Sequence, residues 1–507
     1  MSQFRFHSRT LKIFHLVDAT SNLDLIKRLS PSRWVNKFRF PLWLFTLTLL
    51  IPNFAVAQTQ HVAATMVADA GGANLPLRFL GLSYEMSILL PKNGRYYFDP
   101  KDRALINTFQ TLGIRSLRVG ANAVDDPRIP IPQEKDIDKL FDFARAAGVK
   151  VIYSFRLKDG DPTNSARLAS YIAAHDADAL ECFAIGNEPN FYGTFESFYA
   201  HWKPQYDAIL KAVPDAMFDG PSADGSFALH LAEDVYADRH LAMASDHYYF
   251  LGSGRAGEKN PAATRVRFLS NDRDDDYEKD YARVGAVLAA KGVPYRIDEM
   301  NSCYNGGAKD SSDTYASALW ALDCTHWWAA HHILGVNYHT GESVGRDGKF
   351  GPPNYAAFLC QTDGRGFTMR PLAYADLAFS QGAHGRPVGV KIQAASTFNF
   401  NAYAYQDRDG SIYLTLINKS FGDEAQLASV SVALPKNMDS GSWQRMDLVQ
   451  QDQDIAAKTG VMLGGTVIDP QGNWNGQWEK LEGSNSGGPT VQVSPASATI
   501  LLFSPTK

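Results

Sequence analysis

The sequence predicts an α/β fold, a (β/α)₈ TIM barrel followed by a C-terminal all-β sandwich domain. Short apolar runs alternate with amphipathic stretches from about Leu77 to Gln381. Buried parallel strands read as continuous apolar runs, and the crossover helices between them are amphipathic. After residue 383 the pattern changes to strand-like runs separated by turn residues. Glutamates also follow the fourth and seventh apolar runs, and barrel enzymes carry catalytic groups at such strand ends.

Eight apolar runs supply the expected barrel strands. They are Leu77–Tyr84, Ser116–Ala121, Val149–Phe155, Glu181–Gly186, Met217–Gly220, Met243–Tyr248, Pro294–Asp298 and Gly335–Tyr338. Between them, the apolar residues recur with helical spacing in Ile137–Ala146, Phe198–Val213 and Tyr281–Ala290. An open doubly wound sheet is the main alternative. It has less support, because no GxGxxG motif follows the first strand.

Residues 384–507 are expected to form the β-sandwich, which leaves residues 76–383 for the barrel. Asp407–Gly410 is a hairpin turn signal between two strand-like runs. The expected strands are Phe398–Tyr405, Ile412–Ile417, Ala428–Leu434, Val491–Val493 and Thr499–Phe503. Apolar residues also alternate at Val62, Ala64 and Met66, so we expect residues 58–75 to add an N-terminal strand to this domain.

Residues 1–57 are typical of a signal peptide with an N-terminal extension. A basic flank precedes the apolar run Leu42–Ile51, and Ala55-Val56-Ala57 matches the small-residue cleavage pattern. The run is too short to span a bilayer comfortably, although an uncleaved signal anchor is the alternative. We therefore expect cleavage near Ala57, a secreted or periplasmic protein, and no stable membrane insertion after signal removal.

Charge and cysteine content limit the partners. The formal net charge is −5, so no strongly basic field is available to hold a nucleic acid. Of the four cysteines, Cys182 is expected to be a buried thiol, whereas Cys303, Cys324 and Cys360 could supply one bridge in an exported protein. No CxxC or HExxH pattern indicates a metal site, and we expect no cofactor.

Two glutamates carry the predicted chemistry. Glu188 lies in the Asn187-Glu188-Pro189 triplet that ends the fourth strand, and Glu299 ends the seventh. Cleavage of a glycosidic bond needs one carboxylic acid to protonate the leaving oxygen and a second carboxylate to attack or to activate water. We predict Glu188 as acid/base and Glu299 as nucleophile, with carboxyl groups about 5–5.5 Å apart and net retention. Asn187 is expected to bind the sugar 2-hydroxyl. Either glutamate alone could merely end a strand or form a salt bridge, but the pair favours catalysis.

These motifs resemble those of clan A glycoside hydrolases. The run Glu299–Gly307 (EMNSCYNGG) is similar to the nucleophile loop of glycoside hydrolase family 79, which holds the β-glucuronidases and heparanase. Phe79–Glu85, Leu117–Gly120 and His247–Tyr249 agree as well. The resemblance implies a retaining exo-β-glucuronidase that hydrolyses terminal β-D-glucuronosyl residues through a covalent glycosyl-enzyme intermediate. Its substrate would be a glucuronic-acid-containing glycoside, oligosaccharide or polysaccharide.

In that family the loop after the nucleophile binds the carboxylate of the substrate. Tyr304 would donate a hydroxyl, and backbone N–H groups around Gly306 and Gly307 would form an anion-binding concavity. Glycine lets the backbone approach the ligand closely. A flexible turn is the alternative for this loop. Glu85 resembles the acidic residue that binds sugar hydroxyls, although that residue is Asp in heparanase.

Three further residues are expected to support the nucleophile and the pocket. Tyr248 could hydrogen-bond Glu299 and orient it, or could instead be an aromatic core residue. Arg118 could hold Glu299 ionised through its opposite charge, or could form a salt bridge at the barrel mouth. Tyr355 is expected to close the pocket after the eighth strand.

Three alternatives to an exo-β-glucuronidase stay open. A heparanase-like endo-β-glucuronidase would need basic clusters beside the cleft, and the sequence offers only scattered basic residues such as Arg265 and Arg267. Another clan A specificity is the second alternative. A catalytically silent carbohydrate-binding protein is the third, and the presence of both glutamates argues against it.

Overall fold

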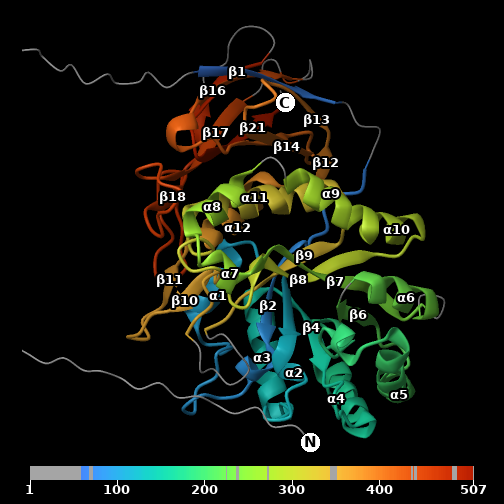
Figure 1. The fold of residues 1–507 in the computed structure, drawn as a ribbon. Helices are drawn as coiled ribbons and strands as arrows, with labels where there is room; N and C mark the ends of the chain where they lie inside the picture. The colour runs from blue at the N-terminus through green and yellow to red at the C-terminus, as the bar shows by residue number, and fades with distance from the viewer. Residues whose placement is uncertain are drawn as a thin grey trace, which may run out of the picture. The chain divides into compact units, whose positions relative to one another are not determined.

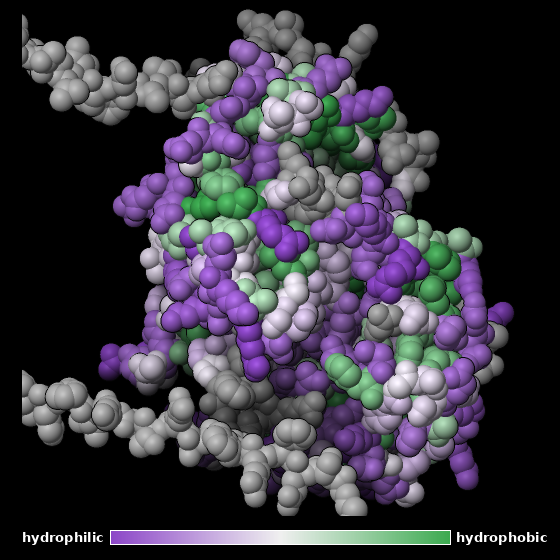
Figure 2. Space-filling model, in the orientation of Figure 1, coloured by the Kyte–Doolittle hydropathy of each residue, from purple (hydrophilic) through white to green (hydrophobic). Residues whose placement is uncertain are grey.

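A computed structural model describes residues 59–67, 72–223, 225–235, 239–270, 273–342, 351–434, 438, 442–481 and 488–505. The expected signal segment, with its cleavage position near Ala57, lies outside these residues. None of the helices within the described ranges is long and apolar enough to cross a membrane. Hydrophilic side chains cover much of the face shown in Figure 2, and hydrophobic ones lie there in separate patches.

Eight parallel strands close into a barrel in which each strand pairs with the next and the last pairs with the first (Figure 1). The strands are β2 (Leu80–Glu85), β3 (Ser116–Gly120), β4 (Lys150–Phe155), β5 (Leu180–Ile185), β6 (Phe218–Ala223), β7 (Leu241–Ser253), β8 (Tyr295–Tyr304) and β9 (Gly335–His339). Every predicted apolar run coincides with one of them. The prediction of a (β/α)₈ barrel is therefore confirmed.

Helices connect the strands and cover the outside of the barrel. They are α1 (Arg103–Thr111), α2 (Ala121–Val124), α3 (Glu134–Ala147), α4 (Pro162–His175), α5 (Phe195–Ala212), α6 (Gly225–Val235), α7 (Gly254–Gly257), α8 (Pro261–Leu269), α9 (Arg273–Arg283), α10 (Gly285–Ala290), α11 (Tyr315–Ala330) and α12 (Pro371–Gly382). The single helix predicted over Tyr281–Ala290 is wrong, because α9 ends at Arg283 and α10 starts at Gly285. A β-branched Val284 followed by glycine disfavours a continuous helix at this point.

Two further sheets, packed face to face, form the all-β domain. One sheet has the order β13-β1-β16-β20, and the other has the order β12-β14-β15-β21-β17-β18, with β19 paired to β17. The strands are β1 (Thr59–Met66), β12 (Arg386–Val388), β13 (Val390–Gln393), β14 (Phe400–Gln406), β15 (Ile412–Asn418), β16 (Leu427–Ala433), β17 (Ser442–Gln450), β18 (Val461–Leu463), β19 (Glu479–Leu481), β20 (Thr490–Val493) and β21 (Ser497–Ser504). Val62, Val430 and Leu414 are buried in one apolar cluster that joins the two sheets.

Strand β1 comes from the start of the described chain and lies inside the first sheet. It runs parallel to β16, with Val62 opposite Val430, and antiparallel to β13. A short hairpin, β10 (Phe358–Cys360) and β11 (Phe367–Met369), precedes α12.

Helices α11 and α12 lie between the barrel strands and the β-domain (Figure 1). Nearly all of α11 is buried, which explains why its sequence is apolar on every side. Its one buried carboxylate, Asp323, accepts hydrogen bonds from Lys419, Asn401 and Tyr403 of the β-domain, at 3.1, 2.8 and 2.8 Å. This ionic and polar cluster joins the barrel to the β-domain.

All four cysteines are free thiols. Cys182, Cys303 and Cys324 are buried, and Cys360 is exposed. The bridge that the sequence left open among the last three is not formed, and these residues lie on β8, α11 and β10.

Candidate active site

A pocket of about 650 Å³ opens at the carboxyl ends of the barrel strands. Six of the residues predicted from the sequence line it: Glu85, Glu188, Glu299, Tyr304, Gly306 and Tyr355. Their strands lie far apart in sequence, but the carboxyl ends of parallel barrel strands share one face. Asn187 and Arg118 lie next to these residues, whereas Gly307 and Tyr248 do not line the pocket.

The chain positions Glu188 through an unusual backbone after β5. Gly186 has φ +85°, and a Cβ there would lie 2.7 Å from Leu157, so only glycine fits. Glu188 itself is in the left-handed region, with φ +44° and ψ 53°. Its N–H donates to the Ser222 carbonyl at 2.8 Å. A non-glycine residue held in this region costs energy and is common at functional sites.

Glu299 is buried at the end of β8 and accepts two charge-assisted hydrogen bonds. Arg118 Nη1 donates to Oε2 at 2.7 Å, and the Tyr249 hydroxyl donates to Oε1 at 2.7 Å. Burial alone would raise the pKa of Glu299. The nearby His339, His247 and Arg118 side chains and the Tyr249 hydrogen bond outweigh burial and hold the pKa well below its usual range. Glu299 is therefore ionised.

Arg118 is fully buried beneath the pocket and holds several site residues at once. Besides Glu299 it contacts Asp298 at 2.9 Å, and it donates to Ser83 Oγ at 3.0 Å. Its Nη2 donates to Asn187 Oδ1 at 2.7 Å. Arg118 thus also fixes the orientation of the Asn187 amide. The amide oxygen faces the guanidinium, and the amide nitrogen is directed away from it.

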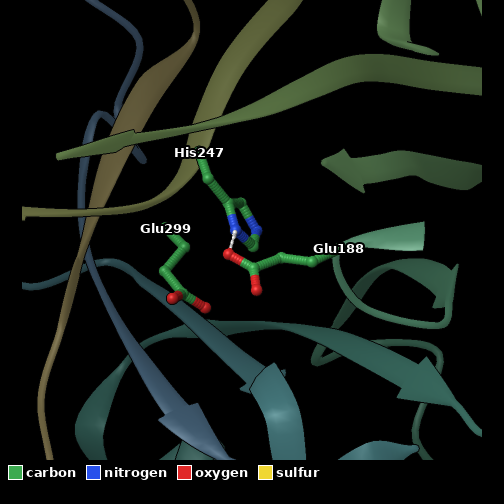
Figure 3. Close-up of side chains that lie close together, drawn as sticks. All are labelled: Glu188, His247 and Glu299. Atoms are coloured by element: carbon green, nitrogen blue, oxygen red, sulfur yellow. Dashed lines mark hydrogen bonds and ion pairs between the residues drawn. The ribbon is translucent and has the colours of Figure 1, made fainter. Parts of the chain in front are cut away.

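His247 contacts Glu188 and lies near Glu299, and the predicted site omitted it. Figure 3 shows its ring against the Glu188 carboxyl group, with Nδ1 at 3.1 Å from Glu188 Oε1. Burial alone would lower the pKa of His247. The negative charges of Glu299, Glu188 and Asp298 outweigh burial and raise the pKa to about 9. A protonated His247 therefore donates to Glu188 at neutral pH.

The same three side chains offer ligand atoms that a metal ion could share. One atom each from Glu188, His247 and Glu299 lies within 4.8 Å of the other two. However, Arg118 already occupies Glu299 Oε2, and protonated His247 occupies Glu188 Oε1. Because protein donors already hold one oxygen of each glutamate, the set fits proton transfer better than it fits a bound metal.

The expected contact between Tyr248 and Glu299 is wrong, and Tyr249 makes it instead. The Tyr248 ring points outward and packs against Trp328 and Tyr277, with ring centroids 5.6 and 6.0 Å apart. Successive side chains of a strand face opposite sides, so His247 and Tyr249 face the pocket. The register between β7 and β8 shifts at His247, and this irregularity hides the alternation from sequence reasoning.

Replacing Tyr249 with Phe should lower kcat about 10- to 100-fold, because a hydrogen bond to a charged group contributes about 1.5–3 kcal/mol. Tyr248→Phe is the matched control and should change kcat less than about threefold, since its ring lies outside the pocket. Steady-state kinetics on one glycoside substrate compares the two. Equal losses in both variants would contradict the assignment of Tyr249.

The loop after β8 is bent at three consecutive residues. Asn305, Gly306 and Gly307 have φ values of +60°, +82° and +80°. Gly307 lies behind Tyr355, and a Cβ there would come within 3.0 Å of that ring. Tyr304 is 46% exposed at the mouth, with its ring edge-to-face against Tyr249.

Other pocket residues were missed by the sequence analysis. They are Asn122, Phe191, Tyr249, Asn305, His339, Thr340 and Pro353. Phe191 is 77% exposed and also lines a smaller hollow of about 200 Å³ beside Glu188. Its position three residues after Glu188 is a signal that could have been read from the sequence. Tyr249 and His339 lie on β7 and β9 and Asn122 lies on α2, whereas Asn305, Thr340 and Pro353 come from loops.

Loss of the His247 proton at alkaline pH should lower the free energy of unfolding. Histidine has an ordinary pKa of about 6.5. The folded protein raises the pKa of His247 to about 9, so the proton stabilises the fold fully below about pH 6.5. This stabilisation is lost as pH rises through about 9. Urea unfolding at several pH values should show a falling free energy of unfolding over this window. In His247→Gln, the free energy of unfolding should depend less on pH over this window. A variant with the same pH dependence as the wild type would contradict the role of His247.

Comparisons with known proteins find β-glucuronidases among the sequences similar to this chain. No protein-family model matches the chain. A β-glucuronidase from Aspergillus niger is 21% identical over 309 residues, which cover 55% of this chain and 53% of the relative. A β-glucuronidase from Neurospora crassa is 27% identical over 109 residues, covering 22% of this chain and 19% of the relative. The chain thus matches about half the length of the first relative and less of the second.

Solved structures share the fold over most of the chain. A 4-O-α-L-rhamnosyl-β-D-glucuronidase from Fusarium oxysporum superposes with a TM-score of 0.65 at 17% identity, covering 88% of this chain and 100% of that one. A family 51 α-L-arabinofuranosidase from Bifidobacterium longum gives a TM-score of 0.62 at 14% identity, covering 87% and 99%. These likenesses confirm the predicted fold, and the similar β-glucuronidase sequences agree with the resemblance that the motifs indicated.

Proposed function

We propose that this protein is a retaining exo-β-glucuronidase. The observation that carries the proposal is the placement of Glu188 and Glu299 across one pocket, where one carboxyl oxygen of each lies within 4.8 Å of the other. Retaining enzymes hold their carboxyl groups about 5–5.5 Å apart, whereas inverting enzymes leave about 6.5–9.5 Å for a water. The short separation supports double displacement, and the similar β-glucuronidases support the sugar.

In the first step, Glu299 attacks the anomeric carbon while Glu188 donates its proton to the leaving oxygen, so the glycosidic bond breaks as the glycosyl-Glu299 bond forms. In the second step, Glu188 removes a proton from water, whose oxygen displaces Glu299. Arg118 and Tyr249 keep Glu299 ionised for attack. Asn187, whose oxygen binds Arg118, can donate its amide N–H to the sugar 2-hydroxyl.

The loop after β8 would hold the carboxylate of a glucuronosyl residue. Among the residues that the structure describes, the Gly307 N–H donates to no acceptor, whereas the Gly306 backbone is hydrogen-bonded to the Tyr355 side chain. Successive backbone N–H groups in such a bend form an anion-binding concavity. Gly306 and the Tyr304 side chain both line the pocket. These donors support a uronate rather than a neutral sugar.

Tyr304→Phe should lower kcat/KM on an aryl β-glucuronide about tenfold, because the ring stays and only the hydroxyl donor to a charged group is lost. The same variant should change kcat/KM on the matching aryl β-glucoside less than about twofold. Kinetics on both substrates measures the difference. An equal loss on both would mean that Tyr304 does not select the carboxylate.

A panel of aryl β-glycosides tests the proposed function itself. We expect turnover of the glucuronide, with the β-anomer of the free sugar formed first in a time-resolved NMR experiment. Turnover of the glucoside or xyloside without the glucuronide would reject the uronate assignment. Binding without turnover of any glycoside would reject an enzyme.

A further inference from the structure

A second hollow, of about 680 Å³, lies between the loops that follow β2 and β9. Four basic side chains line it: Arg95, Lys101, Arg103 and Arg365. All four are exposed. We call this feature the basic hollow. It stands out because the whole chain carries a formal net charge of −5.

The charges of the basic hollow are largely unbalanced. Within the described ranges, no carboxylate lies at ion-pair distance from Arg95, Lys101 or Arg103, and Arg365 has only Asp363 at 3.8 Å. The acidic side chain in the lining, Asp102, accepts the Leu105 N–H at 3.0 Å and so caps α1. The N-terminus of α1 adds partial positive charge.

The basic hollow is built by three segments that lie far apart in sequence. Arg95–Ala104 supplies one side and the β10–β11 hairpin another, and residues near Gln471 of the β-domain complete it. Hydrophilic residues cover the hairpin, at the left of Figure 2. Gly366 has φ +129°, and a Cβ there would lie 2.1 Å from the Pro470 carbonyl, so glycine lets the hairpin pack onto the β-domain. The Phe367 N–H donates to the same carbonyl at 2.8 Å.

The basic hollow and the catalytic pocket share the same two loops. Glu85 and Thr340 of the catalytic pocket lie at the ends of β2 and β9, and the basic hollow uses later residues of the same connections. Glu342 joins the two loops, because it accepts the Cys360 N–H at 3.0 Å and the Tyr97 hydroxyl at 3.5 Å. Both hollows therefore open on the carboxyl-end face of the barrel.

We propose that the basic hollow binds a carboxylate-bearing glycan, as a distal site for an acidic chain that is cleaved in the catalytic pocket. Guanidinium groups bind carboxylates through paired, charge-assisted hydrogen bonds. Uronosyl residues repeat a carboxylate along the chain, so several cations can be used at once. The proposal rests on the proposed β-glucuronidase function.

The first test compares two double variants of equal charge change. Arg95→Ala/Arg103→Ala should lower kcat/KM on a glucuronate oligosaccharide at least about tenfold, and on a small aryl β-glucuronide less than about twofold. Lys211→Ala/Lys279→Ala removes two exposed cations that line neither hollow and should change neither value. High salt should shrink the loss by screening. An unchanged oligosaccharide rate, or an equal loss in the control, would overturn the proposal.

The second test measures binding without turnover. The full chain carrying Glu299→Gln is titrated calorimetrically with polyglucuronate, a sulfated dextran oligosaccharide or a neutral glucan. We expect polyglucuronate to bind, and Arg95→Ala/Arg103→Ala to weaken its binding at least about tenfold. Binding only of the sulfated chain, or equal binding of the neutral one, would overturn the proposal. A wild-type chain that hydrolyses no glucuronide would reject the proposed function and leave this binding result to stand by itself.

Discussion

Glu299→Gln should lower kcat/KM on an aryl β-glucuronide by at least about 10⁴-fold, as removal of a central catalytic group does in other hydrolases. The amide cannot attack the anomeric carbon, although it can still accept the Tyr249 hydrogen bond. Binding of the glycoside should persist, because the substitution changes the size of the side chain little. Activity is measured with substrate concentrations above and below KM, and circular dichroism checks the fold.

Azide distinguishes the nucleophile from the acid/base. With Glu299→Ala, azide should restore activity and give an α-glycosyl azide, because one displacement inverts the anomeric carbon. With Glu188→Ala, azide should attack the glycosyl-Glu299 intermediate and give the β-product. Glu181→Gln, on the far end of β5 and paired with Arg78, is the control and should keep full activity. Exchanged azide products would reverse the two roles.

Arg118→Met should lower the free energy of unfolding by about 3–5 kcal/mol, because removing one partner of a buried ion pair leaves an uncompensated buried charge. Here the buried carboxylates of Asp298 and Glu299 would both lose their cation. The pKa of Glu299 should rise toward its ordinary value, and kcat should fall with it. Urea unfolding gives the first effect, and the acid limb of the pH–rate profile gives the second.

Arg167→Met is the matched control for Arg118. Arg167 pairs with Glu134 at 2.5 Å, and the two side chains are 46% and 48% exposed. Exposed ion pairs contribute about 0–1 kcal/mol, so this variant should unfold with nearly the wild-type free energy. If both variants lost a similar free energy of unfolding, burial would not explain how much the Arg118 ion pairs stabilise the fold.

The barrel could be predicted from the sequence because its strands are buried on both faces. Such strands read as continuous apolar runs, and all eight were found. Several β-domain strands were missed for the opposite reason. Strand β17 has only Trp443, Met446, Leu448 and Gln450 buried, with polar residues between them. Strands β12, β18 and β19 have three residues each, which is too short for any periodicity.

The candidate site was predictable only where a motif marked it. Glu188 and Glu299 stand in recognisable triplets at strand ends, and the structure brings both into one pocket. To choose between Tyr248 and Tyr249 as the partner of Glu299, one must know which residues of β7 face the pocket. A register shift between β7 and β8 obscured this. The basic hollow could not be foreseen, because its cations come from segments whose proximity only the fold creates.

Strand β1 makes the two ends of the described chain depend on each other. It is an interior strand of its sheet, hydrogen-bonded to β13 on one side and β16 on the other. The β-domain therefore cannot be completed until the last third of the polypeptide is available, and long-range pairing of this kind slows folding. A shortened version of the protein has to keep Thr59–Met66, since a cut inside this segment would leave two unpaired sheet edges exposed to aggregation.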